Sequence, residues 1–177
     1  MQVPTAATGG EDWGGDLVIG LGNPLRGDDG VGWWLARRAQ ARGRGRGRAP
    51  GTRPAATVRL VPQLTPELAL EVATARRVLF VDAWCVGGAE GGAGQNPAPL
   101  LRPLRPGEGG EVGVAGGHAL EPGALLALTA LLEGTRPPGW LLLVPAFAFP
   151  HGAALSADLR ARLPAARRLL AAWLADA

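Results

Sequence analysis

The chain has 177 residues, of which 47% are hydrophobic, and these values are typical of one globular domain with a sizeable core. Its formal net charge is only +3, and its pI of about 10.8 is high because every basic residue is Arg, so the pI does not indicate nucleic-acid binding. A single Cys excludes an intramolecular disulfide, and without a secretory signal or an apolar run of roughly 18 residues we expect a cytoplasmic protein that does not enter the membrane.

A short tail precedes the first predicted strand. Residues 1–15 are rich in Gly, Thr and Ala without periodicity, and we expect them to be a flexible N-terminal tail. The remaining residues, 16–177, are expected to form a single domain. Residues 17–21 (LVIGL) are continuously apolar, which is typical of a strand that a parallel sheet buries on both faces.

Two adjacent carboxylates follow this strand, after a glycine-rich turn at 22–27 (GNPLRG) and at the start of a helix predicted over 30–41. One carboxylate is enough to cap a helix N-terminus, so we assign Asp28 to the turn or the cap and Asp29 to function. Leu25 stands where a GxGxxG motif needs its third glycine, and a dinucleotide site is therefore not expected. Sites in open α/β sheets gather at the carboxyl edge, where this turn lies.

The rest of the chain alternates between strand and helix patterns. We expect strands over 57–61, 77–82 and 140–144, an edge strand over 99–104, and helices over 66–74, 122–133 and 156–175. This alternation predicts an α/β fold, a three-layer αβα sandwich around a mostly parallel, twisted sheet of about five strands.

Two segments between these elements are rich in glycine. Residues 42–48 (RGRGRGR) are interpreted as an exposed flexible loop, although four arginines on glycine spacers also suit a phosphate-binding arm. Residues 86–117 are long for a connection inside a compact domain, which indicates a lid or a binding loop that selects the partner.

Three side chains from separate loops form a candidate metal site. Asp82 ends the predicted strand 77–82 and therefore lies at the same sheet edge as Asp29, and His118 precedes the helix that begins near residue 122. Two carboxylates and one imidazole suit a divalent ion such as nickel or zinc, with positions left open for substrate. His151 is interpreted as a loop or rim residue, and Cys85 as a small buried hydrophobe.

Four motifs together resemble the hydrogenase maturation endopeptidases: GLGNPLRGDDGVG at 20–32, QLTPEL at 63–68, FVDA at 80–83 and GH at 117–118. The resemblance extends from about residue 16 to residue 174. It implies removal of a short C-terminal extension from the large subunit of a nickel-iron hydrogenase after nickel has been inserted. It also implies that Asp29, Asp82 and His118 recognise that nickel.

Because the nickel belongs to the substrate, the resemblance implies transient nickel and no permanent cofactor. The expected partner is the large-subunit precursor; we expect a monomer and no nucleic-acid partner. In the expected mechanism, the substrate's nickel polarises the peptide carbonyl or its bound water, while Asp29 or Asp82 orients that water as general base.

Two alternatives stay open at this stage. Peptidyl-tRNA hydrolases share the GLGNP pattern found at 20–24, but the histidine that such an enzyme carries shortly afterwards is missing from this sequence. The other alternative is a non-catalytic docking module that senses nickel-loaded precursor without cutting it. An assay for precursor cleavage separates this module from a protease.

Overall fold

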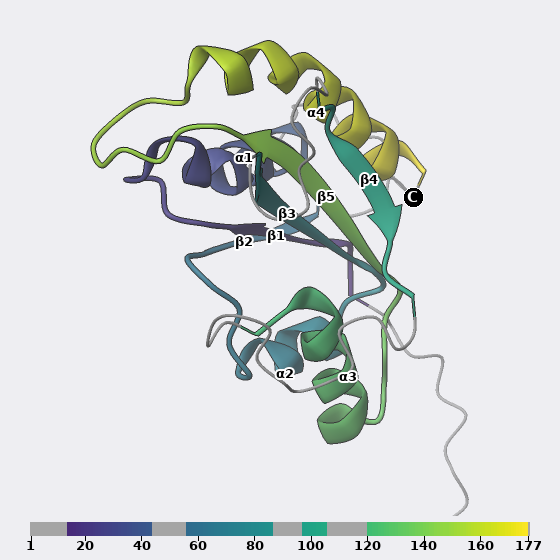
Figure 1. Cartoon of the computed structure of the whole chain (residues 1–177). Coiled ribbons are helices and arrows are strands. Elements are labelled where there is room, and N and C mark those ends of the chain that lie inside the picture. The colour runs from purple at the N-terminus through teal and green to yellow at the C-terminus, as the bar shows by residue number, and fades with distance from the viewer. Residues whose placement is uncertain (1–13, 44–55, 87–96, 106–119, 177) are drawn as a thin grey trace, which may run out of the picture.

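The protein is built around a five-stranded sheet, seen in a computed structural model that describes residues 14–43, 56–86, 97–105 and 120–176 (Figure 1). The strand order is β2-β1-β3-β5-β4, and every neighbouring pair is parallel except β4 and β5. The strands are β1 (Leu17–Leu21), β2 (Thr57–Val61), β3 (Val78–Cys85), β4 (Leu100–Pro103) and β5 (Gly139–Ala146).

Helices cover both faces of the sheet, and the predicted three-layer αβα sandwich is confirmed. Figure 1 shows α1 and α4 on one face and α2 and α3 on the other. Each face has its own hydrophobic core. The helices are the short 3-10 helix η1 (Gly27–Gly30), α1 (Val31–Gly43), α2 (Leu68–Ala73), α3 (Pro122–Glu133) and α4 (Ala157–Ala175).

The central strands are apolar throughout because both of their faces are covered. Along β1, Val18 belongs to the core under α1 and α4, and the next residue, Ile19, belongs to the core over α2 and α3. In β3, Leu79 and Phe80 divide in the same way, and all four side chains are fully buried. A strand in this position needs apolar residues without alternation, as its sequence shows.

The order of the strands creates a switch point between β1 and β3. From β1 the chain passes through α1 to β2 on one side, and from β2 it passes through α2 to β3 on the other side of β1. In open α/β sheets, ligands bind outside the carboxyl ends of the strands at such a switch point.

At the opposite edge of the sheet, a buried ion pair ties the chain together. Asp16, just before β1, accepts hydrogen bonds from Arg76 and from Arg77, the latter at 2.8 Å. The same Nη2 of Arg77 donates to the carbonyl of Trp173 in α4 at 2.7 Å, and the guanidinium lies 4.0 Å from the centroid of that indole. Strands β1 and β3 and helix α4 are thus joined where both strands begin.

Most predicted elements are observed, with small corrections at their ends. The strand over 57–61 and the helix over 122–133 have the predicted bounds, and the predicted edge strand is β4. Helix α2 begins at Leu68 instead of residue 66, because residues 66 and 67 form a turn and no side chain caps the helix. Gly14, which was expected to belong to the N-terminal tail, forms a bridge with Ala75.

Several predicted segments lie wholly or partly outside the described residues. The tail up to residue 13 is among them, and so is most of the long loop predicted over 86–117. Of the arginine-glycine loop, Arg42 and Gly43 belong to α1, and the remainder is not described. Within the described ranges, no helix is long and apolar enough to cross a membrane.

Candidate functional site

The turn after β1 brings the backbone of its two ends into contact. Gly22 has a φ of 105°, a conformation that side chains with a Cβ rarely adopt, and a Cβ placed on it would lie 2.0 Å from the carbonyl oxygen of Asp29. The half-buried carboxylate of Asp29 accepts a hydrogen bond from the backbone N–H of Asn23 at 3.0 Å. The glycine therefore permits the fold of the turn, and the turn fixes one oxygen of Asp29.

Helix α1 begins in direct contact with the backbone of both central strands. A Cβ on Gly32 would lie 2.3 Å from the carbonyl oxygen of Leu21 and 2.4 Å from that of Val81. Only a residue without a side chain allows the helix to start this close to β1 and β3. This contact sets the position of Asp29 relative to the strand that carries Asp82.

Asp82 lies beside the carboxyl end of β1. Gly20 is paired with Val81, so Asp82 comes one residue later in the register, next to the last residue of β1. The prediction that the strand ends at Asp82 is wrong: β3 continues to Cys85, because β5 pairs with it up to Ala146. The two aspartates nevertheless come to the same edge, as predicted.

The charge of Asp82 is poorly compensated. Its Oδ1 accepts one hydrogen bond, from the backbone N–H of Ala83 at 2.7 Å. Burial raises the pKa of Asp82 to about 6, and the negative charge of Asp29 adds to this rise, whereas the Ala83 hydrogen bond acts in the opposite direction. Asp82 is thus mostly ionised at pH 7 and lies next to a second carboxylate. Such a pair attracts a cation.

Asp28 has a structural role, but not as a helix cap. Its side chain is fully buried, and it makes no cap hydrogen bond to η1. Instead its carboxylate accepts four hydrogen bonds from the segment after β5: from the N–H groups of Phe147, Ala148 and Ser156 and from the hydroxyl of Ser156, at 2.7 to 3.1 Å. The structural role of Asp28 agrees with the prediction, although its partners were not expected, and the functional role of Asp29 stays a prediction.

The Ser156 hydroxyl connects this anchor to α4. It donates to Asp28 at 2.8 Å and accepts from the backbone N–H of Leu159 at 3.1 Å, so Ser156 is the N-cap of α4. The contact with Asp28, 128 residues away along the chain, has no local signal in the sequence. That contact gives Ser156 a second role, in holding the loop that carries Asp29.

The third expected ligand cannot be placed. His118 lies in 106–119, outside the described residues, so its role stays a prediction. Within the described part of the chain, no group of three or more His, Cys, Asp or Glu side chains is arranged to hold a metal ion. His151 is exposed in the turn after β5, at the rim where it was expected. The expectation for Cys85 is wrong, because its side chain is exposed at the end of β3.

Solved structures of hydrogenase maturation proteases share this architecture. The maturating endopeptidase HybD of E. coli has 20% identity and a TM-score of 0.62, over 91% of this chain and 92% of its own. HybD of Thermococcus kodakarensis has 19% identity and a TM-score of 0.63, over 90% of this chain and 98% of its own. HycI of T. kodakarensis KOD1 has 18% identity and a TM-score of 0.56, over 90% of this chain and 89% of its own.

By sequence alone, no protein-family model matches the chain, and no significant match to a curated protein is found. The similarity is therefore one of three-dimensional structure, and it extends over nine-tenths of the chain. The chain has the fold of the hydrogenase maturation endopeptidases.

Proposed function

We propose that the protein is an endopeptidase that removes a short C-terminal extension from the nickel-loaded large subunit of a nickel-iron hydrogenase. One observation carries the proposal: in a fold shared with hydrogenase maturation endopeptidases, Asp29 and Asp82 come together at the carboxyl edge of the sheet, beside its switch point. The sequence motifs around both residues support the same family.

The two aspartates are proposed to recognise the nickel that the precursor carries. Among the described residues, each carboxylate accepts one hydrogen bond, which leaves carboxylate oxygen free for a cation. A divalent ion brought by the substrate would offset the repulsion that contributes to the raised pKa of Asp82. His118 is proposed as the third ligand, which would give a set of oxygen and nitrogen donors that suits nickel. Precursor without nickel would then bind poorly.

One of the two carboxylates is proposed to serve also as general base. A pKa of about 6 leaves Asp82 ionised at neutral pH and still basic enough to accept a proton from water. In the hydrolysis, the water oxygen bonds to the carbonyl carbon, the C–N bond breaks, and the leaving amine takes up a proton. The substrate's nickel supplies Lewis acidity next to the scissile bond, and Asp29 or Asp82 orients the water.

The test is to incubate the purified protein with nickel-loaded and nickel-free precursor and to follow the mass of the large subunit. We expect a loss of mass at the C-terminus with the loaded form only. Asp29→Ala should abolish cleavage and leave the melting temperature close to that of the wild type, because the Asp29 side chain accepts one hydrogen bond within the described part of the chain. Asp158→Ala, at an exposed carboxylate in α4, is the control variant.

Three outcomes would count against the proposal. Full cleavage by Asp29→Ala would remove Asp29 from the site. Equal cleavage of nickel-free precursor would remove the metal from recognition. Binding of the loaded precursor without any loss of mass would leave a docking module in place of a protease.

A further inference from the structure

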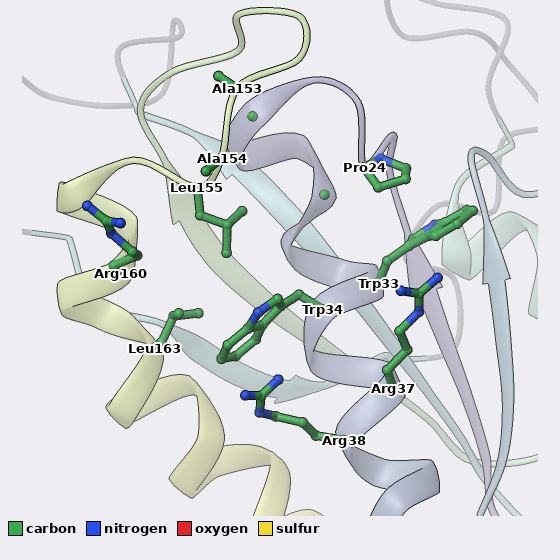
Figure 2. Close-up of a pocket in the computed structure, with 12 residues that line it drawn as sticks. Pro24, Trp33, Trp34, Arg37, Arg38, Ala153, Ala154, Leu155, Arg160 and Leu163 are labelled. Atoms are coloured by element: carbon green, nitrogen blue, oxygen red, sulfur yellow. The ribbon is translucent and has the colours of Figure 1, made fainter.

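A groove of about 580 Å³ lies between helix α1 and the segment that leads from β5 into α4 (Figure 2). Neither Asp29 nor Asp82 lines it, so it is distinct from the two-aspartate site. Figure 2 shows Trp34 reaching from α1 toward Leu155 and Leu163, with Trp33 on the other side of the helix. The groove is thus open, partly aromatic and outside the proposed catalytic centre.

The groove is strongly cationic. Arg37, Arg38 and Arg160 line it, and the guanidinium of Arg167 lies 4.6 Å from the ring centroid of Trp34. Among the described residues, none of these four arginines forms an ion pair, and no carboxylate lines the groove. Burial and the neighbouring Arg167 lower the pKa of Arg38, as expected where like charges are close together. An anionic ligand would relieve this crowding.

The aromatic and apolar residues select among anionic ligands. Arg38 lies 3.5 Å from the ring centroid of Trp34, so two guanidinium groups, those of Arg38 and Arg167, already occupy this indole. That leaves little free ring face for a stacked base, which single-stranded nucleic-acid sites require. Leu155 and Leu163 instead offer aliphatic surface beside the charges. Carboxylates together with apolar side chains match this surface, and both occur in an acidic peptide segment.

The groove is attached to the loop that carries Asp29. Pro24, Gly27 and Gly30 from that loop also line it. The loop is joined to the opposite wall by the Asp28 carboxylate and by the backbone N–H of Gly152, which donates to the carbonyl of Leu25 at 2.8 Å. A segment bound here would therefore lie against the back of the turn that holds Asp29.

We propose that this groove, lined by Trp34, Arg37, Arg38, Arg160 and Leu163, is a docking site for an acidic segment of the precursor that carries apolar anchor residues and lies away from the cleaved bond. The inference rests on the proposed function, because it takes the precursor to be the partner. Docking at a second surface raises affinity without taking part in the chemistry.

The test compares two double variants with the same change in charge. Arg37→Glu/Arg160→Glu reverses two exposed groove residues, and Arg136→Glu/Arg168→Glu reverses two arginines outside the groove. For nickel-loaded precursor, we expect the groove variant to raise KM and Kd by about tenfold or more, with kcat within about twofold of the wild type. The control variant should stay near the wild-type values, and high salt should reduce the difference.

The outcomes distinguish the two proposals. If the wild type cleaves and both variants have the same KM and Kd, the docking proposal falls and the proposed function stands. If the wild type binds precursor without cleaving it, the proposed function falls, and the Kd values still decide whether the groove is the docking site. If labelled single-stranded RNA binds the wild type but not the groove variant, while Kd for precursor is unchanged, the groove serves nucleic acid and the docking proposal is overturned.

Discussion

The carboxylates of Asp16 and Asp82 lie at opposite edges of the sheet and differ in how their charges are compensated. At the edge where β1 and β3 begin, Asp16 is bound by two guanidinium groups. At the carboxyl edge, Asp82 has one backbone hydrogen bond and a second carboxylate nearby, and burial raises its pKa to about 6. The first arrangement compensates the carboxylate, whereas the second leaves a charge that costs stability when Asp82 ionises.

Asp28 shows that location alone does not decide the role. It lies next to Asp29 at the carboxyl edge, yet it is fully buried and accepts four hydrogen bonds. Its donors compensate the charge as the guanidinium groups compensate Asp16. The number of donors therefore distinguishes the well-compensated carboxylates of Asp16 and Asp28 from the poorly compensated one of Asp82, and the following variants test that distinction.

The largest effect is expected from removing one of the two guanidinium groups that bind Asp16. Arg77→Ala should lower the free energy of unfolding by about 3–5 kcal/mol, because it leaves Asp16 buried with one partner fewer and removes the packing against Trp173. Urea unfolding at pH 7 measures the loss. Arg59→Ala, which breaks an exposed ion pair with Glu71, is the control and should cost less than about 1 kcal/mol. Equal losses would contradict the distinction.

The second largest effect is expected from Asp28→Ala, which should lower the free energy of unfolding by about 2–4 kcal/mol. Three backbone N–H groups and the Ser156 hydroxyl would lose their acceptor at once. Ser156→Ala removes one of these bonds and the cap of α4, and should cost about 1–2 kcal/mol. Denaturant melts of the two variants and of the double variant measure the coupling between the residues. Additive losses would show that the two side chains act independently.

Asp82→Asn should change stability in the opposite direction. Because the folded protein holds the Asp82 proton more tightly than an unfolded chain does, the wild type loses stability as pH rises from about 4 to about 6. The variant escapes this loss and should be more stable by about 1–3 kcal/mol at pH 7, with no gain below about pH 4. Thermal melts across this range measure it. Asp158→Asn, in the first turn of α4, should give no gain at any pH.

The smallest effect concerns binding. If the ionised form of Asp82 receives the nickel of the precursor, affinity should be constant above about pH 6 and should fall by up to about tenfold per pH unit below it. Titration of loaded precursor into Asp29→Ala, whose cleavage is expected to be blocked, measures the residual affinity without turnover. The midpoint in this variant should lie somewhat below pH 6, because the variant lacks the Asp29 charge that contributes to the raised pKa of Asp82. If the affinity of Asp82→Asn for loaded precursor falls with the same midpoint pH, the titrating group is not Asp82.

The fold was predictable wherever the decisive signal is local. The helix over 122–133 combines a Pro at its start with an apolar run and a following Gly, and its bounds are confirmed. The site was predictable in part: Asp29 and Asp82 follow apolar strands, and such strands place them at one edge. The partners of Asp28 were not predictable, because they lie 119 to 128 residues further along the chain. The exposure of Cys85 likewise depends on how far β5 extends beside β3.

The absence of a side chain at Gly32 has a consequence for which substitutions the chain can tolerate. A methyl group there would press on the carbonyl of Leu21, the last residue of β1, and on that of Val81 inside β3, so the helix would have to move away from both strands. Such a movement would separate the turn bearing one acid from the strand bearing the other. Glycine at this one position therefore keeps the two acids close together.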